Sequence, residues 1–267
     1  MDTPAEIVVR SDKDKVVLSG VIGQYRERRP APALEGHFLC VWSNELPRDR
    51  SSRVAVVPDG CVDITWIDGE LVVAGPDMEA ARSALMPGGT VIGARFRPGA
   101  ARGWLGIPMS KILGARVPLQ NFWGKRASAA AERIGDASTT AERMRMLEAV
   151  LCQLARDLEP PKSGMGFVFN ALRSESAGPG MAIILERLDI GPRTLRRRCQ
   201  DAFGYGPKTL DRILRFQRFL ALTRQAEKPR LADLAFAAGY ADQAHLTREV
   251  GRLSGFSPAG IRSQYRA

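Results

Sequence analysis

Apolar residues recur mostly every three or four positions along residues 207–223, as they do in a helix that is buried along one side. These residues are Leu210, Ile213, Leu214, Phe216, Phe219, Leu220 and Leu222. A proline opens the segment, where a helix tolerates it, and no glycine or proline follows. The pattern therefore predicts one helix about 25 Å long. Arg212, Arg215 and Arg218 interleave with the apolar positions, and we expect them to face water or an anion.

The segments on either side of this helix repeat one pattern: a short apolar helix, a tight turn, and a polar helix closed by a glycine and a proline. When the two segments are set together, Leu195 matches Leu246 and Gly204 matches Gly255. Such a unit is a helix-turn-helix, the motif whose second helix enters the major groove of DNA. Two units on one rigid connector predict two recognition helices on the same side of the domain, one DNA turn (~34 Å) apart.

The N-terminal part of the chain shows a different pattern, with short β-branched or aromatic runs separated by DG, PDG and PGG turn signals. Up to Arg97 these runs predict roughly six or seven antiparallel strands, arranged as a small barrel or a jelly-roll-like sandwich. Two apolar runs within residues 1–24 predict a hairpin or a loosely attached arm. Residues 100–105 and 109–113 are expected to form short helices that close this region.

Two longer helices are predicted at residues 127–134 and 139–158, the second capped by Ser138 or Thr139 and reinforced by Glu142. The second helix carries an apolar stripe made of Met144, Leu147, Val150 or Leu151, Leu154 and Leu158. This stripe fits either packing on the β-rich region or a two-helix dimerisation element. Residues 159–164, with the sequence EPPKSG, then break regular structure.

The whole pattern predicts an α+β protein in three parts. Residues 1–124 form a small antiparallel β domain of the barrel or jelly-roll type. Residues 125–162 form a helical linker that is also the candidate dimerisation element. Residues 163–267 form an all-α domain with the tandem helix-turn-helix units.

Composition fits a soluble protein, since 45% of the residues are hydrophobic, 25% are charged, and no apolar run is long enough to cross a membrane. The N-terminus has neither the basic leader nor the cleavage site of a secretion signal. The four cysteines, at positions 40, 61, 152 and 199, show no CxxC spacing and fit a reducing compartment better than a disulfide framework. We therefore expect a cytoplasmic protein with no membrane partner.

The positive charge is concentrated in the C-terminal part. Residues 165–267 hold 17 Lys and Arg against 9 Asp and Glu, which is +8 of the total net charge of +10. Phosphate binding requires such an excess on the helix-turn-helix units, so the charge favours double-stranded DNA as a partner.

The downstream unit, GYADQAHLTREVGRLSGFSPAGIR, resembles the signature of the AraC/XylS family of bacterial transcriptional regulators. The matching positions are Gly239, Tyr240, Asp242, Gln243, Arg248, Gly255 and Pro258. The segments VPDGCVDI, GARFRPGAARGWLGIP and VPLQNFWG are similar to an uncharacterised domain that recurs in front of such DNA-binding pairs. The resemblance implies a transcription regulator, for instance an activator, with a cupin-like domain that senses a small-molecule effector. It also implies a homodimer and contact with RNA polymerase.

The family pattern places particular residues of both recognition helices toward DNA. In the upstream helix, Leu195 and Cys199 should be buried, and the outward residues are Arg193, Thr194, Arg196 and Arg197. In the downstream helix, Leu246 and Val250 should be buried. The residues facing DNA are Gln243, Ala244, Thr247 and Arg248, with His245 at the edge. Arginine can bind guanine, glutamine can bind adenine, and the alanine methyl group can contact a thymine methyl group.

The β domain offers a candidate effector site. Arg95 and Arg97 lie two residues apart and hence on one face of a strand, where they would attract an anionic effector if that face is inward. Trp42 and Trp66 are candidates for lining the pocket. Two buried arginines would need carboxylates opposite them, and residues 59 and 63 are the nearest aspartates. We expect the signal to reach the DNA-binding domain through residues 139–158.

Other kinds of chemistry have less support in the sequence. His37, Cys40 and Cys61 invite a metal or redox interpretation, but no fourth ligand is evident, so we expect no metal and no cofactor. A DNA alkylation-repair enzyme or a cysteine-based sensor would need an activated cysteine, with Cys61 as the candidate. A constitutive architectural DNA-binding protein is a further alternative. We expect a regulator that is not an enzyme.

Overall fold

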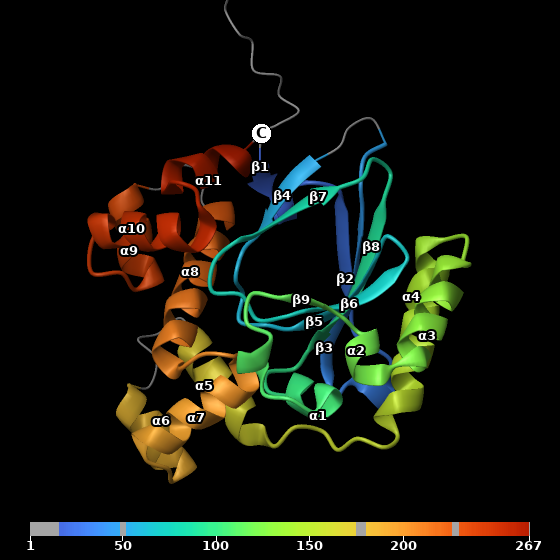
Figure 1. The fold of residues 1–267 in the computed structure, drawn as a ribbon. Coiled ribbons are helices and arrows are strands. Elements are labelled where there is room, and N and C mark those ends of the chain that lie inside the picture. The colour runs from blue at the N-terminus through green and yellow to red at the C-terminus, as the bar shows by residue number, and fades with distance from the viewer. Residues whose placement is uncertain (1–15, 49–51, 175–179, 226–229, 267) are drawn as a thin grey trace, which may run out of the picture.

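The computed structural model describes residues 16–48, 52–174, 180–225 and 230–266 (Figure 1). Strands occupy the N-terminal part of the chain and helices the remainder, so the predicted α+β class is confirmed. The first of the two apolar runs expected in an N-terminal arm or hairpin, at residues 7–9, lies outside the described residues.

The described strands form two sheets. The larger sheet has the order β2-β3-β8-β5-β6-β9, with the bounds Gln24–Arg28, Phe38–Glu45, Thr90–Phe96, Asp63–Ile67, Glu70–Ala74 and Arg116–Pro118. The smaller sheet has the order β1-β4-β7, with the bounds Val16–Leu18, Ser52–Val56 and Ala81–Leu85. Neighbouring strands are antiparallel, as expected, except that β1 and β4 run parallel.

One face of the larger sheet forms the core of the N-terminal region. Short helices and two long ones pack there: α1 (Ala101–Leu105), η4 (Met109–Lys111), α2 (Gln120–Trp123), α3 (Lys125–Gly135) and α4 (Thr140–Ala155). Ile64, Ile92 and Phe96 from the strands are buried with Ile134 and Leu151 from the helices. The burial of these apolar side chains is the main contribution to the stability of this region.

Helix α4 begins with a capping box and packs its apolar stripe on the sheet. Thr139 accepts a hydrogen bond from the Glu142 N–H and Glu142 accepts one from the Thr139 N–H, both at 3.2 Å, so the predicted capping box is present. The stripe residues Met144, Leu147 and Leu151 are buried against the protein's own sheet. This burial agrees with the packing interpretation, and dimerisation through these helices stays a prediction.

The C-terminal region consists of seven helices among the described residues. They are α5 (Ser163–Arg173), α6 (Met181–Leu188), α7 (Pro192–Phe203), α8 (Pro207–Gln225), α9 (Leu231–Ala238), α10 (Gln243–Ser254) and α11 (Pro258–Gln264). The predicted connector is α8, and its Ile213, Phe216 and Phe219 are buried at the centre of a second apolar core. Helices α6 and α7 lie at one end of α8, and α9 to α11 at the other (Figure 1).

The two regions pack against each other at several places. The loop of residues 58–61 lies on the connector, where the Gln217 side chain donates a 2.6 Å hydrogen bond to the Pro58 carbonyl oxygen. Strand β1 reaches the other core, because Leu18 is buried there and its N–H donates to the Gln264 side chain at 2.7 Å. Helix α4, the expected signal path, instead packs against β3, β8 and η3 (Pro32–Leu34). The contacts between the regions are made by the 58–61 loop, by β1, and by η4 and α1, which pack against α7.

Candidate nucleic-acid interface

The first helix-turn-helix unit consists of α6, a turn and α7. Asp189 ends α6 in the left-handed conformation, at φ 49°, and Pro192 occupies the first turn of α7. The apolar side chains of Leu195 and Cys199 are buried, as predicted. Thr194 is half-buried, and the outward face of α7 carries exposed arginines at positions 193, 196, 197 and 198. Four guanidinium groups thus lie on the surface of one short helix.

The second unit consists of α9, a turn and α10. Gly239 ends α9 at φ 86°, and Asp242 caps α10 by accepting a 2.7 Å hydrogen bond from the His245 N–H. This hydrogen bond lowers the pKa of the Asp242 carboxyl group, so the cap is ionised at neutral pH. Leu246 and Val250 are buried, as predicted.

The side of α10 that the family pattern predicts to face outward is exposed. The exposed residues are Gln243, Ala244, Thr247 and Arg248. His245 is half-buried, and its ring meets the edge of the Tyr240 ring at 5.3 Å between centroids. The His245 ring is therefore held against the turn of the unit.

The two recognition helices end in the same way. Gly204 after α7 and Gly255 after α10 both end their helices in the left-handed conformation, at φ 84° and 75°. The alignment that pairs these glycines also pairs Arg197 with Arg248, and both are exposed. Each recognition helix therefore presents an arginine at the same position. DNA contact by these residues stays a prediction.

The three arginines of the connector differ from those of the recognition helices. Arg212 pairs with Glu249 and Arg215 with Asp211. Both therefore face an anion, which is one of the two environments expected from the sequence. Arg218 instead donates hydrogen bonds to the carbonyl oxygens of three residues, at positions 172, 174 and 238. All three arginines are half-buried, so they lie inside the domain's packing.

The N-terminal region contacts the C-terminal ends of both recognition helices. Arg102 of α1 pairs with Asp201 of α7 at 2.6 Å. A Cβ at Gly204 would lie 2.8 Å from Pro76 Cγ, and one at Gly255 would lie 3.6 Å from the Arg82 guanidinium. The residues predicted to face DNA lie in the N-terminal half of each helix, away from these contacts.

The predicted effector residues do not come together. Arg95 pairs with Asp63 and Asp59, both at 3.1 Å, so the expected aspartate partners are present. Arg97 follows the last residue of β8, is exposed, and donates to the Glu35 carbonyl oxygen. The two-residue spacing did not place both guanidinium groups in one site, because the strand ends between them.

The two tryptophans of the predicted site lie on opposite faces of the sheet. Trp42 is paired with Gly93 and lies across it, since a Cβ there would be 2.5 Å from the indole ring. Trp66 is paired with Ile92 of the core face, and its Nε1 donates to the Ala131 carbonyl oxygen at 3.1 Å. Only Trp42 therefore shares a face with Arg95, which is paired with Cys40 on the neighbouring strand.

Among the cysteine and histidine candidates, His37 is buried and Cys40 and Cys61 are half-buried. Burial and the Asp59 carboxylate raise the pKa of the Cys61 thiol, and burial raises that of Cys40 to about 11. His37 accepts a 3.1 Å hydrogen bond from Trp104 Nε1, and burial lowers its pKa. Both thiols are therefore protonated at neutral pH, which disfavours a nucleophilic role. Among the described residues, no three His, Cys, Asp or Glu side chains are grouped to hold a metal ion.

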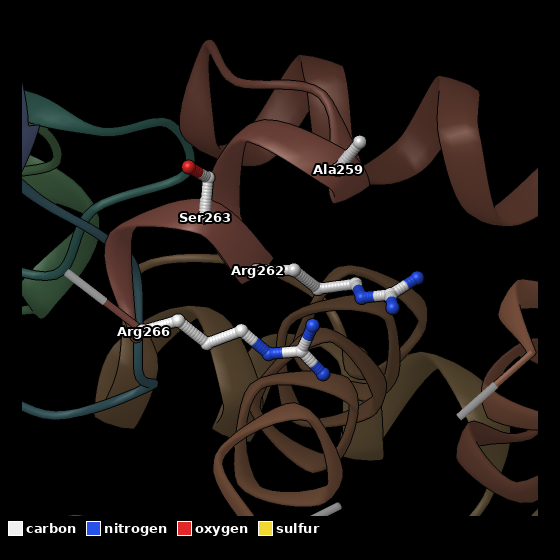
Figure 2. Close-up of a pocket in the computed structure, with 4 residues that line it drawn as sticks. All are labelled: Ala259, Arg262, Ser263 and Arg266. Atoms are coloured by element: carbon white, nitrogen blue, oxygen red, sulfur yellow. The ribbon is translucent and has the colours of Figure 1, made fainter. Parts of the chain in front are cut away.

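Two surface pockets lie away from the predicted residues. One, of about 560 Å³, is lined by Ala259, Arg262 and Ser263 of the last helix and by Arg266, two residues after its end. Figure 2 shows its two arginines lying side by side. The other, of about 180 Å³, is formed between the β5–β6 turn and helices α2 and α3. The first adds positive charge beside α10, against which α11 packs. The sequence pattern gave no sign of either pocket.

Comparisons with known proteins assign both ends of the chain. Residues 26–118 match a domain of unknown function (DUF6597), and residues 184–264 match a helix-turn-helix domain family. The comparison with curated proteins gave no match. No helix among the described residues is long and apolar enough to cross a membrane.

Solved structures of ToxT from Vibrio cholerae are similar at low identity. ToxT from strain O395 is 9% identical, with a TM-score of 0.45 over 84% of this chain and 97% of that chain. Wild-type ToxT from strain SCE256 with a bound unsaturated fatty acid is 12% identical, with a TM-score of 0.43 over 89% of this chain and 97% of that one. At such scores the likeness carries no argument about ligands or partners.

The repeated units, their exposed recognition helices and the two domain matches agree with one another. The C-terminal part is a helix-turn-helix domain of the AraC type and lies behind a DUF6597 domain, so the predicted combination of domains is confirmed.

Proposed function

We propose that the protein is a sequence-specific transcription regulator that reads two successive major-groove segments with α7 and α10. The observation that carries this proposal is the matching exposure of the outward faces of both helices, with Arg197 and Arg248 at equivalent positions. The net charge of +8 on residues 165–267 supports binding to the phosphate backbone. Base contacts by arginine and glutamine would then supply the sequence preference.

In vitro selection from random duplexes, with the full-length protein, tests this proposal. We expect one enriched sequence with two conserved segments 10–10.5 bp apart, about one helical turn. Hydroxyl-radical footprinting of the selected duplex should then show protection at both segments. Similar affinity for the selected and the random duplexes would contradict the proposal and favour the architectural alternative.

We further propose that the N-terminal domain controls DNA binding by responding to a small anionic effector near Arg95. Arg95 is held by Asp63 on the sheet and by Asp59 in the loop that packs on α8. An effector carboxylate that replaced Asp59 on the guanidinium would alter that loop. The half-buried Trp42 on the same face offers apolar surface to the rest of the effector.

A thermal-shift screen with small carboxylic acids tests the effector proposal. A ligand that binds the native protein raises its melting temperature by mass action. We expect some acid to stabilise the wild type and Arg97→Ala alike but to leave Arg95→Ala unchanged, because Arg97 is exposed and lies outside the strand. Equal responses of Arg95→Ala and the wild type would exclude Arg95 from the site.

The domain division and the oligomeric state are further parts of the proposal. We assign residues 1–124 to the sensing domain, 125–162 to the helical segment and 163–267 to the DNA-binding domain, although α3 and α4 share the core of the sheet. The homodimer, activation through RNA polymerase and a cytoplasmic location are inferred from the resemblance to the family. Because the α4 stripe is buried, a dimer would need another surface, and light scattering at several protein concentrations tests for it.

A further inference from the structure

Three arginines follow one face of the connector helix at steps of three residues, and each contacts a different part of the second helix-turn-helix unit. Arg212 makes a two-pronged ion pair with Glu249 of α10, with N–O distances of 2.6 and 3.2 Å. This geometry fixes both the position and the direction of the two side chains, unlike a single contact. The recognition helix is thereby joined directly to the connector.

The other two arginines contact the turn of the unit and the end of its first helix. Arg215, paired with Asp211, lies over the Tyr240 ring at 5.7 Å from its centroid. Arg218 donates to the Ala238 carbonyl oxygen at 3.0 Å, which belongs to the last residue of α9. A cation is favoured at this end of a helix, because its last carbonyl groups lack partners within the helix. All three elements of the second unit are therefore fixed to one face of α8.

Arg218 also extends this connection to the first helix of the domain. Its second terminal nitrogen donates to the carbonyl oxygens of Leu172 and Ser174, at 3.3 and 2.9 Å. These residues lie at the C-terminal end of α5, which packs on α8 and on both helices of the first unit. One guanidinium group thus joins the ends of α5 and α9, which come before and after the connector in the sequence.

The first unit has no equivalent of the Arg212 pair. In the repeat alignment the position of Glu249 is taken by Arg198, which is exposed. Helix α7 instead pairs with the N-terminal region through Asp201 and Arg102. The arginine contacts are therefore a feature of the second unit and not a general property of the repeat.

We propose that Arg212, Arg215 and Arg218 are positioning residues that hold α10 at a fixed distance and angle from α7. They thereby set the spacing between the two DNA segments that the protein reads. This inference rests on the proposed function. The three side chains act through α10 and the turn, and their half-buried guanidinium groups are engaged within the protein. Removing one should loosen the second unit relative to the connector and leave the apolar cores in place.

Duplexes with altered spacing provide the test. The sequence obtained by in vitro selection is remade with one base pair deleted, or with one or two inserted, between its two segments. Each base pair shifts one segment by roughly 3.4 Å and rotates it by roughly 35°. We expect the wild type to lose about 10-fold or more in affinity at each altered spacing, the effect of a mismatched contact.

If the arginines are positioning residues, the DNA affinity of the variants should depend less on the spacing between the two segments. For Arg212→Ala we expect the penalty to fall to about 3-fold or less, because the loosened unit adapts to each duplex. Arg218→Lys should behave in the same way, since one ammonium group cannot bridge the two helix ends. The double variant Arg212→Glu with Glu249→Arg should restore the wild-type profile. Arg133→Ala, an exposed arginine of α3 outside the proposed interface, should keep the wild-type dependence on spacing.

The outcomes separate this inference from the function on which it rests. If Arg212→Ala and Arg218→Lys weaken binding by the same factor at every spacing, the arginines contact DNA or only stabilise the fold, and the inference is overturned. A selected sequence with a single conserved segment also overturns it, while leaving sequence-specific binding intact. If selection enriches no sequence, both the proposed function and the inference are wrong.

Discussion

At the scale of single residues, the arginines of the two recognition helices differ from those of the connector in exposure and in their ion pairs. Arg196 and Arg248 are exposed and form no ion pair with another described residue, whereas Arg212 is paired with Glu249. A free guanidinium group keeps its donors for the edge of a guanine or for phosphate. The same residue type therefore serves two purposes within one domain.

Replacing the exposed arginines should weaken specific binding more than nonspecific binding. We expect Arg196→Ala and Arg248→Ala each to cost about 1–3 kcal/mol on the selected duplex, because a two-pronged contact with a guanine would be lost. Fluorescence anisotropy on the selected and on random duplexes measures both affinities. Arg133→Ala, an exposed arginine of α3, is the control and should change neither. Equal losses on the two duplexes would show that Arg196 and Arg248 contact phosphate only.

At the scale of elements, the two recognition helices begin differently. Asp242 accepts a hydrogen bond from the His245 N–H, whereas Gly191, the residue before α7, has no side chain with which to cap it. The backbone at Gly191 is extended, with φ −76° and ψ 163°, and a Cβ there would have no neighbour within 4 Å. The backbone N–H groups at the start of α7 therefore lack the side-chain hydrogen bond that α10 has. There is space for a capping side chain at position 191.

Gly191→Ser should stabilise the protein by about 0.5–1 kcal/mol, because a serine hydroxyl can cap α7 and the unfolded chain loses flexibility. Urea unfolding followed by circular dichroism measures the change in the free energy of unfolding. Gly191→Ala is the matched control, since it restricts the unfolded chain without adding a hydrogen-bond acceptor. If alanine stabilises as much as serine, capping makes no contribution at this position.

The helical elements were more predictable from the sequence than the sheet. The three-to-four residue period placed Leu195, Cys199, Leu246 and Val250 in the core, because a helix fixes its buried face from local spacing alone. The faces of strands depend on register with partners far away in the chain. Trp42 and Trp66 therefore fell on opposite faces, and the parallel pairing of β1 with β4 had no local signal.

The candidate site divides in the same way. The exposed residues of α7 and α10 followed from the repeat, and the partners of Arg95 followed from the proximity of Asp59 and Asp63 in the chain. The contacts of Arg218 could not be predicted in this way, because every residue has a backbone carbonyl oxygen and the sequence does not show which of them accept hydrogen bonds. The end of β8 one residue before Arg97 was also not evident from the strand pattern.

At the scale of the whole molecule, the N-terminal region contacts the first unit, the connector and the second unit. The contacts are the Arg102–Asp201 ion pair, the 58–61 loop on α8, and Leu18 of β1 in the second core. A structural change in the sheet region can therefore alter the contacts of both helix-turn-helix units. The 58–61 loop is central, because Asp59 pairs with Arg95 while the next residue, Gly60, packs on the helices.

Gly60 provides a way to loosen this contact by a single substitution in the loop. It has φ +83°, and a Cβ would lie 3.0 Å from Phe169 Cε2 and 3.2 Å from Leu210 Cδ1, so Gly60→Ala adds both backbone strain and a close contact at the interface. Gly69, in the β5–β6 turn, has φ +87° with nothing within 4 Å, so Gly69→Ala adds the strain alone. We expect Gly60→Ala to lose more stability than Gly69→Ala, and to be cleaved faster by proteases in residues 159–162, which join the two regions. Thermal unfolding and timed proteolysis measure the two effects. Equal losses in the two variants, with unchanged cleavage, would mean that the packing of the 58–61 loop on α5 and α8 does not hold the regions together.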